Sequence, residues 1–112
     1  MLDAVINLIF GAIECLVDFV IEVIDGVISF IDDVVGYFKK LSLVQGRDIP
    51  FALDGKKFRE ILANAPVKNI GIFEGVYNEQ TNKITDGRYI SGEDVDAKTK
   101  EALGKEGIAV FS

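Results

Sequence analysis

Polar and apolar positions follow an eleven-residue period along the first third of the chain. Written in rows of eleven, the sequence begins MLDAVINLIFG, AIECLVDFVIE and VIDGVISFIDD. The third, seventh and eleventh places of each row hold acidic, polar or small residues, and most other places hold large apolar ones. Eleven residues make about three turns of an α-helix, so the polar positions stay on one face. The pattern predicts one long N-terminal amphipathic helix with a hendecad repeat.

The predicted helix, residues 1–41, has a polar face about 120° wide and an apolar face that fills the rest of its circumference. Asp25-Gly26 is a turn signal, but the polar face crosses it without a shift, which favours one helix over a hairpin. The predicted polar stripe contains Asp3, Glu14, Asp18, Glu22, Asp25 and Asp32. The predicted assembly interface contains Val5, Ile9, Ile13, Leu16, Val20, Ile24, Val27, Ile31 and Val34.

So wide an apolar face needs cover on several sides, because an ordinary surface helix has an apolar stripe only somewhat over 100° wide. Three kinds of cover remain open at this point. Copies of the same helix can supply it, or a membrane can, or this protein's own C-terminal part can wrap a central helix. We expect packing with copies of the same helix.

The rest of the chain divides into a connector, residues 42–53, and a small α+β domain, residues 54–112. The connector contains a short strand around Pro50. Asp54 is a suitable N-cap for a helix that ends before Pro66. The whole chain is therefore expected to be an α+β protein in which a long helix precedes a small head.

Within the head, two apolar runs predict a β-hairpin, followed by a helix and a last strand. The hairpin strands are residues 67–78 and 83–91, joined by a short polar loop. Asp96 caps a helix over residues 97–103, which Gly104 ends. A short apolar strand over residues 108–112 closes the chain, giving the order α-β-β-α-β.

Charge separates the same two regions and excludes one class of partner. The chain has 112 residues and a net charge of −6; residues 1–38 hold seven acids and no base, while residues 39–112 hold twelve bases and eleven acids. The net charge is therefore −7 in the first region and +1 in the second. Without a basic patch to neutralise phosphates, nucleic acid is not an expected partner.

The residue types do not point to catalysis. The sequence has no histidine, and its single cysteine, Cys15, lies in the apolar N-terminal segment. The usual general bases, nucleophile pairs and zinc ligand sets are therefore missing. The acids around Asp94 lack the spacing of an EF-hand loop and are interpreted as helix caps. We predict no catalytic residue, no metal and no cofactor, and a protein that is not an enzyme.

Targeting signals are not evident either. The first residues lack the basic n-region and the small-residue cleavage site of a secretory signal. The longest uncharged run of the apolar segment, residues 4–13, is about half of the roughly 20 residues that span a bilayer. The compartment stays open, with a cytoplasmic or assembly-associated location expected over general secretion.

We therefore expect a non-enzymatic, self-assembling structural protein, a filament, ring or shell subunit that forms a homo-oligomer through residues 1–41. A long apolar N-terminal helix followed by a small head is similar in outline to pilin-like and other filament subunits. Two alternatives stay open. One is a membrane-associated oligomer or pore whose acidic stripe faces a lumen; the other is an adaptor whose apolar helix is capped by a different protein.

Overall fold

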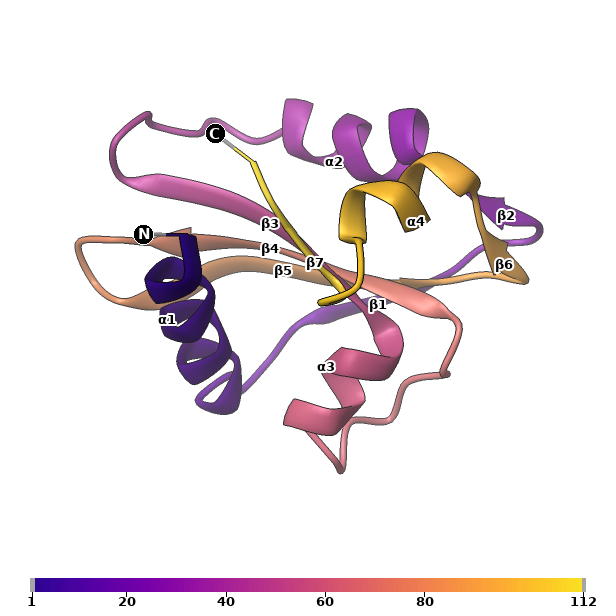
Figure 1. Cartoon of the computed structure of the whole chain (residues 1–112), viewed down its shortest axis with the longest axis horizontal. Helices are drawn as coiled ribbons and strands as arrows, with labels where there is room; N and C mark the ends of the chain where they lie inside the picture. The colour runs from indigo at the N-terminus through magenta and orange to yellow at the C-terminus, as the bar shows by residue number, and fades with distance from the viewer. Residues whose placement is uncertain (1, 112) are drawn as a thin grey trace.

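A five-stranded β-sheet with helices on both faces forms the body of the protein (Figure 1). The structure is a computed structural model that describes residues 2–111; Met1 and Ser112, at the ends of the predicted first helix and last strand, lie outside them. In chain order the elements are α1 (Leu2–Glu14), β1 (Val20–Val23), β2 (Val27–Ile28), the π-helix η1 (Phe30–Val35), α2 (Gly36–Lys39), β3 (Asp48–Asp54), α3 (Gly55–Ile61), β4 (Gly71–Asn78), β5 (Lys83–Ser91), β6 (Asp94–Val95), α4 (Ala97–Leu103) and β7 (Ile108–Val110).

The strands of the large sheet follow the order β1-β5-β4-β3-β7. β1 runs parallel to β5, and every other neighbouring pair is antiparallel. β2 and β6 form a separate parallel pair beyond the ends of β1 and β5. β1 and β2, near the start of the chain, therefore pair with strands from the C-terminal third of the sequence.

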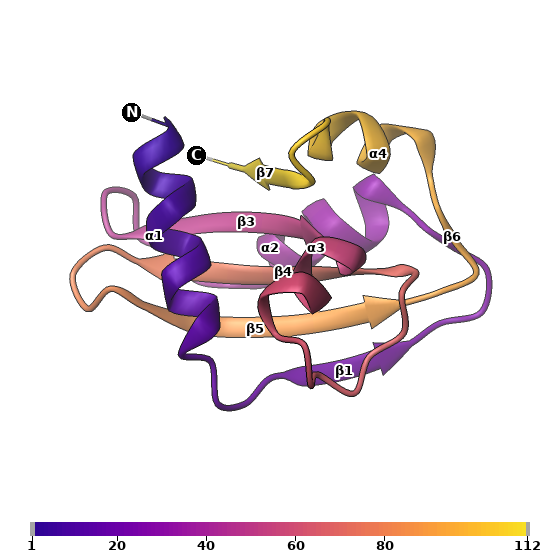
Figure 2. The same ribbon diagram turned by 60° about the horizontal axis from the view of Figure 1, so that its bottom comes forward.

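The sheet lies between two helical layers. Alternate residues of a strand point to opposite faces, so each layer covers a different set of side chains. Figure 2 shows α1 and α3 crossing one face, which buries Phe73 and Tyr77 of β4. The other face carries η1, α2 and α4, which cover Ile72 and Val76 of the same strand. On the first face the ring of Phe58 stacks on that of Phe73, with ring centroids 4.5 Å apart. Both faces of the central strands are buried.

The prediction of one continuous N-terminal helix is wrong. α1 ends at Glu14, and the next regular element is β1. Gly26 has a φ of +97°, a left-handed conformation that turns the chain between β1 and β2. Ile9 and Ile13 of α1 are fully buried against this chain's own sheet. The protein therefore supplies the cover for α1 itself, and the outline similarity to pilin-like subunits no longer holds.

The mixed α+β character and several elements of the C-terminal part are confirmed. The Asp54 carboxylate accepts a hydrogen bond from the Lys56 N–H at the start of α3, although α3 ends earlier than predicted. β5 has the predicted bounds, and Asp96 caps α4 as expected. The strand around Pro50 is longer than predicted and lies between β4 and β7 in the sheet. β7 pairs with this strand, β3, and not with the hairpin.

Candidate functional site: an exposed edge strand and a buried charge cluster

β1 is the outermost strand at one end of the sheet, and its side chains are exposed. The exposed fractions are 62% for Val20, 44% for Ile21 and 62% for Val23. Monomeric soluble proteins expose single apolar side chains routinely, but here three of four consecutive edge-strand positions are apolar and exposed, with Ile21 and Val23 on one face and Val20 on the other. We name residues 20–23 the β1 edge.

The backbone of the β1 edge offers hydrogen-bonding groups on its outer side. The Ile24 N–H, just after the strand, donates to the Ser91 carbonyl oxygen at 2.9 Å, so even-numbered residues turn their backbone groups toward β5. Alternate residues of a strand direct these groups to opposite edges. Ile21 and Val23 therefore direct theirs away from β5, where no strand of residues 2–111 pairs with them.

The β1 edge has only part of the usual protection against pairing with another chain, because the strand is short and carries one charge, Glu22. Natural edge strands are commonly guarded by lysine, proline or a covering loop. The sequence VIEV contains neither residue, and Val17 and Val27, on either side of it, are also exposed. The opposite edge strand, β7, has three residues, of which Ile108 and Ala109 are buried. The two ends of the sheet are therefore unlike, and only the β1 end is an open apolar edge.

Arg88 of β5 connects the β1 edge to the rest of the protein. Its Nη1 donates to Glu22 of β1 at 3.0 Å, and its Nη2 donates to the Asp33 carbonyl oxygen of η1 at 2.7 Å. Its Nε and Nη2 both donate to Oε1 of Glu74 on β4, at 2.9 and 2.7 Å. The guanidinium also lies over the ring of Tyr37 on α2, 4.4 Å from the centroid. One side chain thus joins five elements.

Glu74 is the deepest member of this charge cluster. Its side chain is fully buried, and its Oε2 has no hydrogen-bond partner among residues 2–111. Burial raises the pKa of Glu74 to about 8, and the neighbouring Arg88 only partly opposes the rise. Burial, together with the charges of Asp86 and Glu74, also raises the pKa of Tyr37. The cluster is a low-dielectric site with an unsatisfied carboxyl oxygen.

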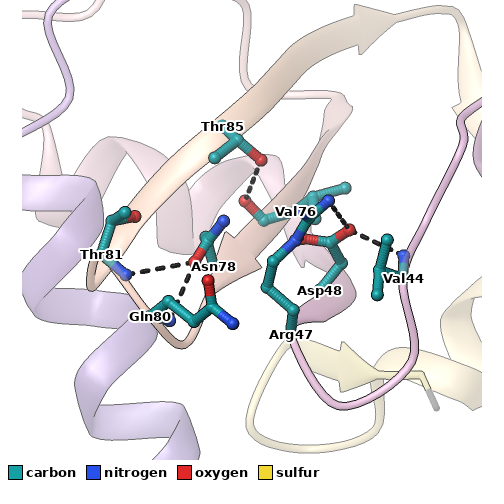
Figure 3. A network of polar contacts seen from close by, with 8 residues as sticks. All are labelled: Val44, Arg47, Asp48, Val76, Asn78, Gln80, Thr81 and Thr85. Carbon is teal, nitrogen blue, oxygen red and sulfur yellow. Dashed lines mark hydrogen bonds and ion pairs between the residues drawn. The ribbon is translucent and has the colours of Figure 1, made fainter.

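A second polar network lies where β4 and β5 are joined, near the β4–β5 turn (Figure 3). Arg47 and Asp48 form an ion pair at 2.9 Å, and Asp48 also accepts a hydrogen bond from the Val44 N–H. These hydrogen bonds lower the pKa of Asp48, with that from Arg47 contributing most. The Asn78 side chain accepts from two backbone N–H groups in the hairpin turn. The polar groups of this network bond to one another, so it fixes loops and turns.

An open groove of about 640 Å³ lies between α1 and the β4–β5 turn. Its wall is mainly apolar, and the Tyr77 hydroxyl in it donates to the Asn82 side chain at 2.9 Å. Asp18 and Lys83 are the charged residues that line it. Residues 2–111 contain no group of three or more metal-ligating side chains. The groove therefore lacks the convergent titratable groups of a catalytic site.

The predicted assembly-interface residues are distributed over both layers of the protein. Three are fully buried in the chain's own cores, and three are exposed. The buried ones are Ile9, Ile13 and Val34; the exposed ones are Val20, Val27 and Ile31; Val5, Leu16 and Ile24 are partly buried. The structure does not bring the nine onto one surface.

The predicted polar stripe is also divided, although each of its acids is exposed. They lie on α1, the α1–β1 connection, β1, the following turn and η1: Asp3, Glu14, Asp18, Glu22, Asp25 and Asp32. Only Glu22 joins the buried charge cluster. Its partners Glu74 and Arg88 were not predicted, and the one signal in the sequence was the glutamate within the otherwise apolar run of β4.

No helix of residues 2–111 combines the length and the apolar character needed to cross a bilayer. Comparison of the chain with protein-family models, with curated proteins and with solved structures found no match. The fold and site define a class in structural terms: a mixed five-stranded sheet, covered by helices on both faces, with one open apolar edge strand.

Proposed function

We propose that this protein is a non-enzymatic self-assembling protein whose copies associate through the β1 edge. The observation that carries the proposal is an unpaired edge strand that exposes Val20, Ile21 and Val23. An exposed apolar edge adds a further strand readily, because backbone hydrogen bonds and apolar burial act together. The sequence predicted an interface along a long N-terminal helix, and the interface proposed here is this one strand.

A second copy fits this edge because the strand is complementary to itself. A twofold axis perpendicular to the sheet would pair two β1 strands antiparallel and keep equivalent residues on the same face. With Ile21 at the axis, it faces Ile21 of the other copy, and Val20 faces Glu22. A shift that centred Glu22 would instead oppose two carboxylates, which is destabilising. Ile21 is therefore the expected centre.

This arrangement uses backbone groups that the fold leaves free. Ile21 and Val23 direct their N–H and C=O groups outward, as the antiparallel pairing requires. Two five-stranded sheets would then become one continuous sheet of ten strands. Because the same surface is used by both copies, the association closes at a dimer, and any larger assembly requires a second interface.

The first test compares two double variants by light scattering over a range of protein concentrations. Ile21→Lys/Val23→Lys should remain monomeric where the wild type is dimeric, because it places two charges at the centre of the edge. The matched control is Leu8→Lys/Val44→Lys, which changes two exposed apolar side chains, 53% and 47% exposed, on α1 and in the loop before β3, neither of which pairs with β1. The control should keep the wild-type mass.

Crosslinking then tests the register. Ile21→Cys in a Cys15→Ser background should form a disulfide between two copies under mild oxidation, because opposed strand residues lie within disulfide reach. Val44→Cys in the same background is the control and should stay uncrosslinked. A wild type that remains monomeric at high concentration would sink the proposal, and an adaptor that pairs its edge with a different protein would then be the leading function.

A further inference from the structure

The charge cluster under η1 and α2 holds one cation between two carboxylates. Arg88 contacts both Glu22 and Glu74, so the group carries one negative charge if both acids are ionised. It is neutral if one of them is protonated. Burial of net charge is costly, and the more buried carboxyl is the one that gains by keeping its proton.

The geometry at Glu74 agrees with a protonated carboxyl group. Two nitrogens of Arg88 converge on the same oxygen, Oε1, where a bidentate ion pair would use both oxygens. The other oxygen, Oε2, is fully buried and has no hydrogen-bond partner among residues 2–111. A negative charge on Oε2 would have no hydrogen bond there, which costs more than an unbonded neutral hydroxyl group. The proton therefore belongs on Oε2.

Every element packed against Glu74 contributes to this environment. β5 presents Arg88, η1 contributes the charge of Asp33, and β1 contributes Glu22. α2 covers the cluster with Tyr37, whose hydroxyl also senses Asp86. On the β3 side the register partner of Glu74 is Ala52, which is buried and uncharged. Arg88 is thus the one cation among several acids.

We propose that Glu74 is a proton-operated latch for the edge of the sheet. While its carboxyl keeps a proton, Arg88 holds β1 through Glu22 and η1 through the Asp33 carbonyl. When the pH rises, Oε2 gives its proton to hydroxide, and the cluster changes from neutral to one negative charge. Solvent must then reach the carboxylate, and it does so by loosening β1 and η1, the elements that Arg88 binds.

The latch acts on β1 within one chain, so it goes beyond self-association and does not depend on it. The monomeric Ile21→Lys/Val23→Lys variant retains Glu22, Glu74 and Arg88 and should show the same behaviour. Failure of dimerisation therefore leaves this inference standing. Failure of the latch likewise leaves the β1 edge as an interaction surface.

The direct test is a carbon-13 NMR titration of the Glu74 side-chain carboxyl in the wild-type protein. We expect a midpoint near pH 8, far above that of an exposed glutamate. This measurement needs no variant that must fold. A midpoint below about 5, in the range of ordinary glutamates, would overturn the proposal.

The release of β1 is read from amide hydrogen exchange. The Ile24 N–H, bonded to the Ser91 carbonyl, should lose about tenfold in protection factor between pH 6 and pH 9, because ionisation of Glu74 opens the edge. Glu74→Gln imitates the protonated acid and should remove this pH dependence. Glu79→Gln, an exposed acid just after β4, is the matched control and should retain it. Equal pH dependence in all three proteins would contradict a latch.

A second variant tests how far the pKa of Glu74 depends on sharing Arg88 with Glu22, apart from its burial. Glu22→Gln removes the competing carboxylate and leaves Arg88 to Glu74 alone. The titration midpoint of Glu74 should then move to lower pH, because one cation now serves one acid. An unchanged midpoint would contradict the charge sharing on which the proposed latch depends.

Discussion

β1 and β4 belong to the same sheet and have similar sequences, yet their surroundings are opposite. VIEV in β1 is exposed at all four positions, whereas GIFEGVY in β4 is buried throughout. Each strand is apolar with one glutamate, and the two glutamates contact the same arginine, Arg88. Apolar composition therefore indicates extended structure in both cases, while position in the sheet decides what the apolar side chains contact.

The two glutamates show how position changes chemistry. Glu22, at the edge, is about half exposed, and water solvates its charge. Glu74, between two neighbouring strands and beneath helices, is fully buried, and its pKa rises to about 8. β1 is therefore the exposed edge of the sheet and β4 its buried centre. Three substitutions can break or sharpen this comparison.

The largest expected effect is that of Phe73→Ala on β4. Phe73 is fully buried, and its ring contacts Phe58, Phe19 and Phe51. The free energy of unfolding should fall by about 3–5 kcal/mol, because the truncation leaves a cavity in the core. Ile21→Ala on β1 is the comparator and should cost less than about 1 kcal/mol in the monomer. Urea denaturation at low protein concentration measures both, and equal costs would contradict the assignment of centre and edge.

An intermediate effect is expected for Gly71→Ala at the start of β4. A methyl group there would lie 2.5 Å from the Tyr89 ring and 2.7 Å from the Ile90 carbonyl oxygen. The overpacking should lower the free energy of unfolding by about 1–3 kcal/mol. Gly11→Ala in α1, where a methyl group meets nothing within 4 Å, is the control. It should be neutral or stabilising, as measured by the same denaturation.

The smallest effect is expected for Glu22→Gln on β1. The ion pair with Arg88 is partly exposed at Glu22, and such pairs contribute less than about 1 kcal/mol. The loss should shrink further at high salt, because screening weakens partly exposed pairs. Thermal unfolding at low and high salt checks this, and a cost of several kcal/mol would mean that Glu22 is more deeply integrated than its exposure indicates.

Local signals in the sequence predicted most helices and strands of the C-terminal part of the fold. Asp54 and Asp96 cap helices as their positions predict, and Gly104 follows the second of these helices with a positive φ. The hairpin was predictable because its two strands are adjacent in the chain and joined by a short polar loop. These features depend on neighbours in the sequence, which a single sequence displays.

The N-terminal part of the fold could not be predicted from such local signals. β1 and β2 are short parallel strands whose partners, β5 and β6, lie near the other end of the chain. Glu22, Asp25 and Ser29 have the spacing of one helix face, although they lie in an edge strand, a turn and a helix cap. The Val and Ile residues between them favour strands, and Gly26 is a turn residue, but the regular spacing outweighed both signals.

The candidate site was hidden for a related reason. Glu74 and Arg88 come together because β4 and β5 pair in one register, in which each lies directly opposite the other. Glu22 reaches them only through the parallel contact of β1 with β5. The sequence shows three separate charges, and the pairing of three strands makes them one cluster.

The parallel placement of β1 beside β5 also bears on how the chain folds as it is synthesised. Glu22 and Arg88, which meet across these strands, are 66 positions apart in the chain. The ribosome makes about 5–20 residues per second, so β1 waits several seconds before β5 exists. Closing so large a loop is slow compared with forming the β4–β5 hairpin. β1 is thus expected to dock among the last elements. Until then the nascent chain carries this apolar strand without its partner, where chaperones and neighbouring chains on the same messenger RNA can reach it.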